Sequence, residues 1–294
     1  MRLRTLPLSF SSILTGSAIV AAGNPKFTGI LLLALLTTFL LQVLSNFAND
    51  YGDFRNGADN HQRTGPKRAV QSGEISPKAM LYASILTAIL SFAAGIGLLL
   101  YSFSEGNQLL IILFTLLGLA AIAAAFNYTA GKNPYGYKAM GDISVLIFFG
   151  FVGVLGTSYL HTNTLQIIQI LPALTIGCLA SAVLNLNNMR DVVNDQASGK
   201  ITLAVKLGSE KAKIYHVVLF AVAWTSIAAY MLLSKAPVVS AIVFLVLPIH
   251  IIHLMKVKKN KEPENLDPEL KKIALSTFLI ALILFLSNLF LSQG

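Results

Sequence analysis

The chain has 294 residues, of which 55% are hydrophobic and only 12% charged, whereas a soluble domain carries about 25% charged residues. This composition excludes an ordinary soluble protein and indicates an integral membrane protein. The net charge of +9 does not indicate nucleic-acid binding, because the basic residues flank apolar runs and are not interleaved with aromatic residues along a groove. The single cysteine, Cys178, lies in an apolar run and provides neither a disulfide framework nor a metal cluster.

Nine apolar runs are long enough, or nearly so, to cross a bilayer, which takes about 20 residues of helix. None of them contains Asp, Glu, Lys or Arg, which argues against a proton pump or an ion channel, because charges inside the membrane usually mark such pathways. We therefore predict an all-α membrane protein with a single domain over residues 1–294. The predicted helices span residues 6–22, 27–47, 79–101, 109–126, 143–160, 165–186, 214–233, 237–255 and 273–291.

The basic residues are divided unequally between the two sides of the predicted bundle. The N-terminus and the connections after the second, fourth, sixth and eighth spans hold 20 of the 22 Lys and Arg, which leaves Lys26 and Lys235 on the other side. By the positive-inside rule, the N-terminus and these four connections lie in the cytoplasm. An odd number of spans then places Gly294 outside.

Two of the cytoplasmic connections, residues 46–78 and 185–208, share a pattern of acids. In each, an asparagine precedes two acids that are three or four residues apart, and a glycine follows four residues after the second acid. If the preceding helix continues, either spacing places both carboxylates on one face, where like charges repel and a positive partner is expected. The copies are separated by four spans, so they run parallel and can face one another as halves of one site. They comprise Asn49, Asp50, Asp53 and Gly57, then Asn188, Asp191, Asp195 and Gly199.

These acids and asparagines form an all-oxygen ligand set, which suits magnesium far better than zinc or copper. Magnesium held by few carboxylates keeps open positions, which substrate phosphate commonly fills. Metal and bases together predict a clamp that stabilises the charge developing on a leaving diphosphate. The bases are Arg55, Arg63, Lys67 and Arg68 in the first connection and Arg190, Lys200 and Lys206 in the second. For any one of these charges the alternative is a solvated connection, but two similar connections on one face favour a site.

The connection after the fourth span, residues 126–142, is a turn that adds Tyr128 and Lys132 on the cytoplasmic side. Tyr128 could bind a substrate oxygen and Lys132 a phosphate. An interfacial tyrosine beside a snorkelling lysine is an equally good interpretation. His250 and His253, at the end of the eighth span, have no third partner nearby in the sequence, so we expect interfacial helix residues rather than metal ligands.

Over almost its full length the chain resembles the UbiA superfamily of intramembrane aromatic prenyltransferases. The superfamily motifs NDxxDxxxD and DxxxD are similar to the two acidic connections, and a tyrosine and a basic residue between them match Tyr128 and Lys132. The chain departs from the pattern at Gly57, where the third acid would stand, and Asp59 lies close enough in sequence to replace it.

Three segments look most similar to the 1,4-dihydroxy-2-naphthoate polyprenyltransferase branch of menaquinone biosynthesis: NDYGDFRNGADNHQRTGPKRAVQSG, NPYGYKAMGDISVLIFFG and NNMRDVVNDQASGKITLAVKLG. The resemblance implies nine helices around a central cavity open to lipid, under a cytoplasmic cap made by the acidic loops, in the bacterial cytoplasmic (inner) membrane. It implies Mg2+-dependent transfer of a polyprenyl group from an all-trans polyprenyl diphosphate to the naphthoate, with loss of diphosphate and carbon dioxide, giving demethylmenaquinone.

Carried over to this chain, the resemblance assigns catalysis and metal binding to Asp50, Asp53, Asp191 and Asp195. It also matches Asn49, Tyr128 and Lys132. With the bases and the asparagine that lie beside the acids, these residues make up the predicted substrate-binding set: Asn49, Arg63, Lys67, Arg68, Tyr128, Lys132, Asn188, Arg190 and Lys200. No residue is assigned to the acceptor ring.

Two other functions are compatible with these motifs. The enzyme could prenylate another aromatic acceptor, such as 4-hydroxybenzoate or homogentisate. Alternatively, the protein could transport or bind a phosphorylated lipid without catalysis. A transporter should show interrupted spans and polar groups at the membrane midplane, whereas the charged groups here collect at one face.

Overall fold

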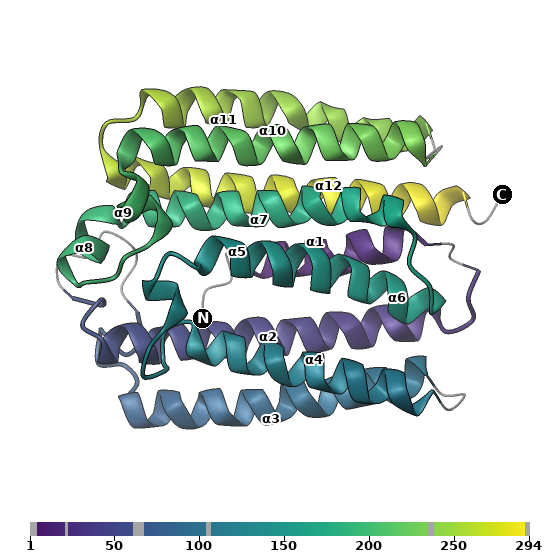
Figure 1. Ribbon diagram of the computed structural model, residues 1–294, viewed down its shortest axis with the longest axis horizontal. Helices are drawn as coiled ribbons and strands as arrows, with labels where there is room; N and C mark the ends of the chain where they lie inside the picture. Colours follow the sequence, from purple (N-terminus) through teal and green to yellow (C-terminus); the bar gives the residue numbers. More distant parts are fainter. Residues whose placement is uncertain (1–4, 21–22, 61–67, 104–106, 235–237, 292–294) are drawn as a thin grey trace.

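The computed structural model describes residues 5–20, 23–60, 68–103, 107–234 and 238–291. For residues 290 and 291 it describes the backbone only. Within these residues the regular secondary structure is helical, and the connections contain one isolated backbone bridge between Lys138 and Ile201. The long helices lie side by side with their axes roughly aligned (Figure 1). Such an arrangement suits a bilayer, because each helix satisfies its backbone hydrogen bonds internally. The predicted all-α fold is therefore confirmed.

The helices follow the predicted spans, often with a turn more at the ends. Ser76 caps the third predicted span by accepting a hydrogen bond from the Ala79 amide, and Pro77 occupies the first helical position. The elements are α1 (Leu6–Ala18), α2 (Phe27–Arg55), α3 (Pro77–Ser102), α4 (Gln108–Asn127), η2 (Tyr135–Tyr137), α5 (Gly141–Val145), η3 (Leu146–Leu155), α6 (Gly156–Thr162), η4 (Ile167–Gln169), α7 (Ile170–Arg190), α8 (Val192–Ala197), α9 (Leu203–Leu207), α10 (Ser209–Leu233), η5 (Val238–Val246), α11 (Leu247–Lys259), η6 (Pro263–Leu266) and α12 (Asp267–Leu291).

Eight of the nine predicted spans are long and apolar enough, within the described residues, to cross a membrane. The exception is α1, which has 13 residues where a span needs about 20. It packs along α12, η3 and α2 and completes the bundle. The fifth predicted span is continuous from Gly141 to Thr162 but includes the π-helical segment η3.

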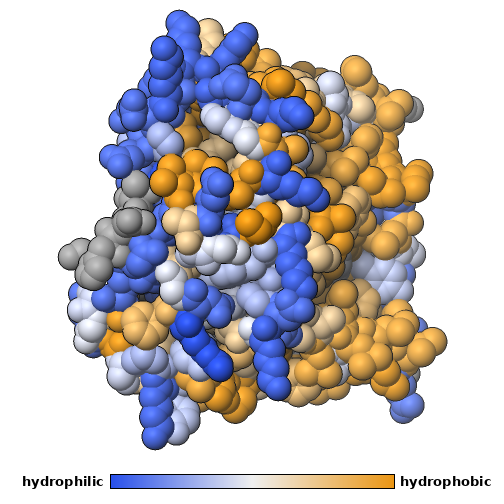
Figure 2. Space-filling model, turned by 60° about the vertical axis from the view of Figure 1, so that its left-hand side comes forward, coloured by the Kyte–Doolittle hydropathy of each residue, from blue (hydrophilic) through white to orange (hydrophobic). Residues whose placement is uncertain are grey.

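Polar groups gather at one end of the bundle. The short helices α8 and α9 lie at that end, together with the connections after α2 and α4 (Figure 1). Hydrophilic residues cover this end, whereas hydrophobic residues cover the flank that runs along the helices (Figure 2). Leu109 and Leu116 of α4 and Ile214 of α10 are among the exposed apolar residues of the long helices, which form the kind of surface that a bilayer would contact.

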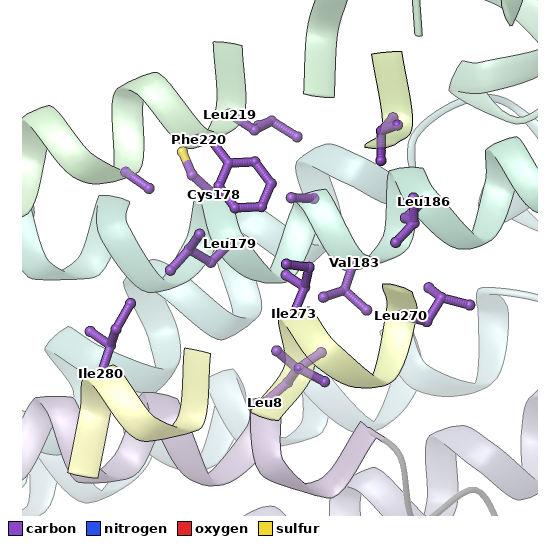
Figure 3. Packing of buried hydrophobic residues seen from close by; sticks show 14 of the residues in the cluster. Leu8, Cys178, Leu179, Val183, Leu186, Leu219, Phe220, Leu270, Ile273 and Ile280 are labelled. Carbon is purple, nitrogen blue, oxygen red and sulfur yellow. The ribbon is translucent and has the colours of Figure 1, made fainter. Parts of the chain in front are cut away.

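The core is built around α7, the most buried of the spans. Leu179 and Leu186 of α7 pack with Phe220 of α10 and Ile273 of α12 (Figure 3). Lipid tails are as apolar as leucine, so helices in a membrane associate through close packing of small residues. A side-chain carbon added to Gly150 of η3 would lie 2.6 Å from the Ala173 carbonyl oxygen and 3.0 Å from the Cα of Gly177. The crossing of η3 and α7 therefore requires glycine.

Our expectation of interfacial positions for His250 and His253 is wrong, because both are buried. The Nε2 atoms of His253 and His216 lie 2.8 Å apart, and His253 Nδ1 lies 2.7 Å from a carboxylate oxygen of Glu269. Trp224 donates its indole hydrogen to Nδ1 of His250. These contacts join α10, α11 and α12. The sequence analysis missed them because the partners of His253 lie 16 and 37 residues away along the chain.

Replacing Gly150 by alanine should lower the stability of the bundle, because the added methyl group would push η3 away from the backbone of α7. Overpacking of this kind costs about 1 to 3 kcal/mol. We expect a lower midpoint of thermal unfolding for the Gly150→Ala protein in detergent. Gly97→Ala is the matched control, since nothing lies within 4 Å of a side-chain carbon added there. An equal midpoint for both variants would contradict the close crossing.

Candidate functional site

A cavity of about 750 Å³ lies between α1, α2, α3, α4, η3 and α7. This volume is in the range of small-molecule sites, about 300 to 1,000 Å³. At the polar end of the bundle its wall contains Asp50, Asp53, Arg68 and Lys200. Away from that end the lining is mainly apolar, and Phe92, Ile96, Leu117, Phe148 and Val152 are among its residues. One continuous space therefore joins a charged end to an apolar chamber.

Asp50 and Asp53 lie on the last turns of α2, because this helix continues to Arg55. The condition that the preceding helix continues through the acids is thus met for the first pair. Gly57 then ends the helix with a φ of +75°, and the Ala58 amide donates to the Asp53 carbonyl. A left-handed residue at this position is typically glycine, so the backbone explains the departure from the superfamily pattern. The turn brings Asp59 back toward the end of α2.

Arg68 is buried among three carboxylates of its own connection. Its Nη1 lies 2.6 Å from Asp53 Oδ2 and 2.9 Å from Asp59 Oδ2, and its Nε lies 3.5 Å from Asp50 Oδ1. Burial alone would lower the pKa of the guanidinium, but the three acids hold that pKa above its ordinary value. Asp59 therefore supplies a third carboxylate at Arg68, in the absence of an acid at position 57.

The second acidic connection departs from a single continuous helix. Helix α7 ends at Arg190 and α8 begins at Val192, so the condition that the preceding helix continues through both acids is not met for Asp191 and Asp195. The Asp195 amide still donates to the Asp191 carbonyl over 2.9 Å, which keeps the two acids one turn apart. Arg190 explains the break, because its guanidinium binds the Asp191 carboxylate at 2.7 Å and that of Asp267 at 2.6 Å.

Lys200 links the two acidic connections. Gly199, with a φ of +74°, turns the chain after α8, and the Lys200 amide donates to the Asp195 carbonyl. The ammonium group then lies 3.6 Å from Asp195 Oδ1 and 3.8 Å from Asp53 Oδ2. Gly57 and Gly199, the glycines of the internal repeat, therefore play the same backbone role in the two copies.

The connection after α4 joins the same cluster through a residue that the sequence analysis missed. The hydroxyl group of Tyr137 donates to Asp53 Oδ1 over 2.8 Å, and the Lys200 ammonium lies 5.5 Å from the centre of its ring. Burial and the Asp53 carboxylate raise the pKa of this hydroxyl, which keeps it a donor. No local sequence signal marks Tyr137, because its partner lies 84 residues away.

Tyr128 and Lys132, the two residues singled out in this connection, take different places. Tyr128 lines the cavity, and its ring fits against Gly136 and Gly141, where an added side-chain carbon would approach to within 3.0 Å of the ring or its hydroxyl. Lys132 is exposed and is not among the residues that line the cavity. The structure therefore brings Tyr128, but not Lys132, to the site.

The other predicted residues sort into four groups. Those that line the cavity are Asn49, Asp50, Asp53, Arg68, Asn188, Arg190 and Lys200. Asp191 and Asp195 are buried just outside this lining. Arg55 and Lys206 are exposed at the surface of the cap. Arg63 and Lys67 lie outside the described residues.

The cap network has the composition of a site for a divalent cation. Among the described residues, five buried carboxylates (Asp50, Asp53, Asp59, Asp191, Asp195) lie with three buried cations (Arg68, Arg190, Lys200). Burial raises the pKa of Asp195 to about 6, although Lys200 opposes the shift, and its Oδ2 has no hydrogen-bond partner within the described part of the chain. No three potential ligands there converge closely enough to complete a metal site alone. Magnesium fits this arrangement, because it usually binds one or two carboxylates and fills its remaining positions with water and phosphate.

Comparisons with known proteins agree with this geometry. Residues 9–276 match the model of the UbiA prenyltransferase family. A curated relative from Haemophilus influenzae, 1,4-dihydroxy-2-naphthoate octaprenyltransferase, is 43% identical over 98% of this chain and 94% of its own length. A relative of the same name from Escherichia coli is 39% identical over 100% of this chain and 94% of its own length.

Solved structures share the fold. A UbiA homolog from Archaeoglobus fulgidus superimposes with a TM-score of 0.70 at 17% identity, over 100% of this chain and 98% of the other. The structure of such a homolog bound to GPP and Mg2+ gives a TM-score of 0.67 at 18% identity, covering 99% of each chain. The family match covers most of the chain, and the two bacterial relatives align with almost all of it. The chain therefore belongs to the UbiA prenyltransferase family.

Proposed function

We propose that this protein transfers a polyprenyl group from an all-trans polyprenyl diphosphate to 1,4-dihydroxy-2-naphthoate, with release of diphosphate and carbon dioxide, and that it requires Mg2+. The observation that carries the proposal is the single cavity, which joins a cluster of acids and buried cations to an apolar chamber. A prenyl diphosphate has the same two parts, a charged head and an apolar tail.

The diphosphate would bind at the polar end of the cavity. Asp50, Asp53, Asp191 and Asp195 would hold the magnesium, which neutralises charge on the departing diphosphate when bound. Arg68, Arg190 and Lys200 are already buried beside these acids and would bind the phosphate oxygens. Asn49, Asn188 and Tyr128 line the same end and can contact polar atoms of the substrate.

The apolar part of the cavity would hold the prenyl chain and protect the reaction from water. Departure of diphosphate leaves an allylic cation, which a dry chamber shields until the electron-rich ring attacks it. Phe92, Phe148 and Phe149 line this chamber, and their ring faces can stabilise a cation. The chain itself thus supplies binding, orientation and exclusion of water.

The choice of acceptor rests on the relatives. Both near-full-length bacterial relatives are named for 1,4-dihydroxy-2-naphthoate, at 43% and 39% identity. The product would be demethylmenaquinone. A transporter is disfavoured because the acids around Arg68, Arg190 and Lys200 lie together with these cations at the end of the bundle, whereas a transporter holds its polar groups near the membrane midplane.

Purified protein should prenylate 1,4-dihydroxy-2-naphthoate but not 4-hydroxybenzoate or homogentisate, and only with magnesium present. The assay offers each ring separately with a polyprenyl diphosphate in liposomes, with magnesium or with a chelator, and measures product by mass. Prenylation of another ring would keep the mechanism and refute the acceptor. Binding of the lipid diphosphate without any product would favour a transport or binding protein.

Replacing Asp191 by alanine should abolish turnover while the protein remains folded, because one carboxylate of the proposed metal site is lost. We expect a loss of at least about a hundredfold in kcat, with an unchanged elution profile in detergent. Glu210→Gln is the control, since Glu210 is an exposed acid that pairs only with Lys213 among the described residues. Activity close to wild type in folded Asp191→Ala protein would contradict the metal assignment.

The chain is a multi-pass membrane protein with bacterial relatives, and we propose that its N-terminus and cap lie in the cytoplasm and its C-terminus outside. The distribution of Lys and Arg supports this orientation. In a Cys178→Ala background, a cysteine at Lys132 should react with a membrane-impermeant maleimide only after permeabilisation. A cysteine at Thr164, in the opposite connection, should react in intact spheroplasts without permeabilisation. The reverse labelling pattern would overturn the orientation.

A further inference from the structure

The connection between α11 and α12 lies at the polar end of the bundle, together with the three connections that meet at Asp53 (Figure 1). Its short helix η6 leads directly into α12, and both elements contact α7. Leu266 and Leu270, on either side of this junction, are buried in the same core cluster as Leu186 and Met189 of α7. The beginning of α12 is therefore fixed against the end of α7, where the second acidic connection starts.

Asp267, the first residue of α12, reaches the cap from this junction. Its Oδ1 accepts a hydrogen bond from Arg190 Nη1 over 2.6 Å, although the two residues are 77 positions apart in the sequence. The Arg190 side chain is only 3% exposed, whereas that of Asp267 is 34% exposed. Hydrogen bonds between charged groups are shorter and stronger than those between neutral groups. A carboxylate at the edge of the cap thus holds a buried cation at the cavity wall.

Three further bonds of the Arg190 guanidinium come from the end of its own helix. Nε and Nη2 donate to the two carboxylate oxygens of Asp191, over 2.8 and 2.7 Å, and Nη2 also donates to Asn187 Oδ1 over 2.9 Å. Asp191 follows Arg190 directly and Asn187 precedes it by about one helical turn, so these acceptors move with the end of α7. The bond to Asp267 differs in two respects. Its acceptor belongs to another helix, and it uses Nη1, whereas the other three bonds use Nε and Nη2.

This difference bears on the proposed roles of Arg190 and Asp191. The proposed function assigns the Asp191 carboxylate to the metal and the Arg190 guanidinium to phosphate. Asp191 shares both of its oxygens with Arg190, so a second cation bound there weakens this paired contact, because two positive groups repel one another. The bond from Nη1 to Asp267 does not involve those oxygens. It retains Arg190 at the cavity wall when the contact with Asp191 rearranges.

The first turn of α12 gives Asp267 a rigid base. Glu269, in the same turn, accepts a hydrogen bond from Lys272 over 2.5 Å and lies 2.7 Å from Nδ1 of His253 in α11. His253 in turn lies 2.8 Å from His216 of α10. A supporting side chain positions a binding group well when its own backbone is fixed by packing and hydrogen bonds. The position of Asp267 is thus fixed by neighbouring helices before any substrate binds.

We propose that Asp267 is a positioning residue for the diphosphate: it holds the guanidinium of Arg190 at the polar end of the cavity and acts on the substrate only through Arg190. The assignment rests on the proposed function and extends the cap to the fourth connection. An arginine that is held in advance loses less entropy when it binds phosphate, so it contributes more to affinity. Binding of the polyprenyl diphosphate, rather than of the aromatic acceptor, therefore depends on Asp267.

Replacing Asp267 by alanine should raise KM for the polyprenyl diphosphate about tenfold, since a hydrogen bond to a charged group contributes on this scale, and leave KM for 1,4-dihydroxy-2-naphthoate within about twofold of wild type. The equilibrium dissociation constant of an unreactive prenyl thiodiphosphate should rise by the same factor. Asp267→Glu, which keeps the charge, should recover most of the affinity. Glu264→Gln is the matched control and should change neither constant, because Glu264 is an exposed acid of η6 in the same connection.

A double-variant cycle separates positioning from a general effect on packing. In an Arg190→Gln background, Asp267→Ala should raise the dissociation constant of the thiodiphosphate no further, since a residue that acts only through Arg190 has no effect without it. Equal factors in the two backgrounds would overturn the assignment. Should Asp267→Ala lose the folded elution profile in detergent, Asp267→Asn, which keeps the shape of the side chain, takes its place in the same cycle.

Unchanged constants in the folded Asp267→Ala protein, or a rise confined to the naphthoate, would also overturn the positioning role while leaving the proposed function intact. If the wild-type protein transfers no prenyl group, the proposed function fails instead. In that case equilibrium binding of the thiodiphosphate decides the assignment. Weaker binding by Asp267→Ala supports it, and equal or absent binding refutes it.

Discussion

The carboxylate of Asp53 joins the three segments of the cap. One of its oxygens is bound by Arg68 from its own connection and approached by Lys200 from the connection after α7, and the other accepts the hydroxyl hydrogen of Tyr137 from the connection after α4. A buried ion pair adds little net stability, because desolvation offsets most of the attraction. What this network contributes is geometry, since three segments remote in sequence are held at the mouth of one cavity.

That geometry explains how charge and a dry chamber coexist. Among the described residues, buried carboxylates at the cap outnumber buried cations, which suits the binding of a metal cation, and Arg68, Arg190 and Lys200 lie beside them where they could bind phosphate. A few helical turns away, the lining becomes leucine, isoleucine and phenylalanine. Electrostatic interactions strengthen where water is excluded. The charged groups that bind the diphosphate beside the apolar chamber can therefore also stabilise the negative charge that develops on it as its bond to the prenyl group breaks.

The sequence was sufficient for features that depend on local pattern. Span lengths follow from runs of apolar residues. Asp50 and Asp53 share one face because α2 continues as a regular helix to Arg55, so their spacing in the sequence is enough to place them. Features that depend on distant partners were not predictable. Tyr137 meets Asp53 across 84 residues, and His253 meets His216 across 37. The break at Asp191 arises because Arg190 binds it, a contact that spacing alone does not reveal.

The most direct test of this account replaces magnesium by paramagnetic Mn2+ and adds an unreactive prenyl thiodiphosphate to the purified protein. Pulsed electron–nuclear resonance then reports whether phosphorus lies in the coordination sphere of the metal. The account predicts a strong phosphorus coupling in wild-type protein that is lost or greatly weakened in Asp53→Asn, because the carboxylate that joins the cap is gone. Bound Mn2+ without phosphorus coupling, or a coupling unaffected by Asp53→Asn, would contradict a metal–diphosphate site organised by Asp53.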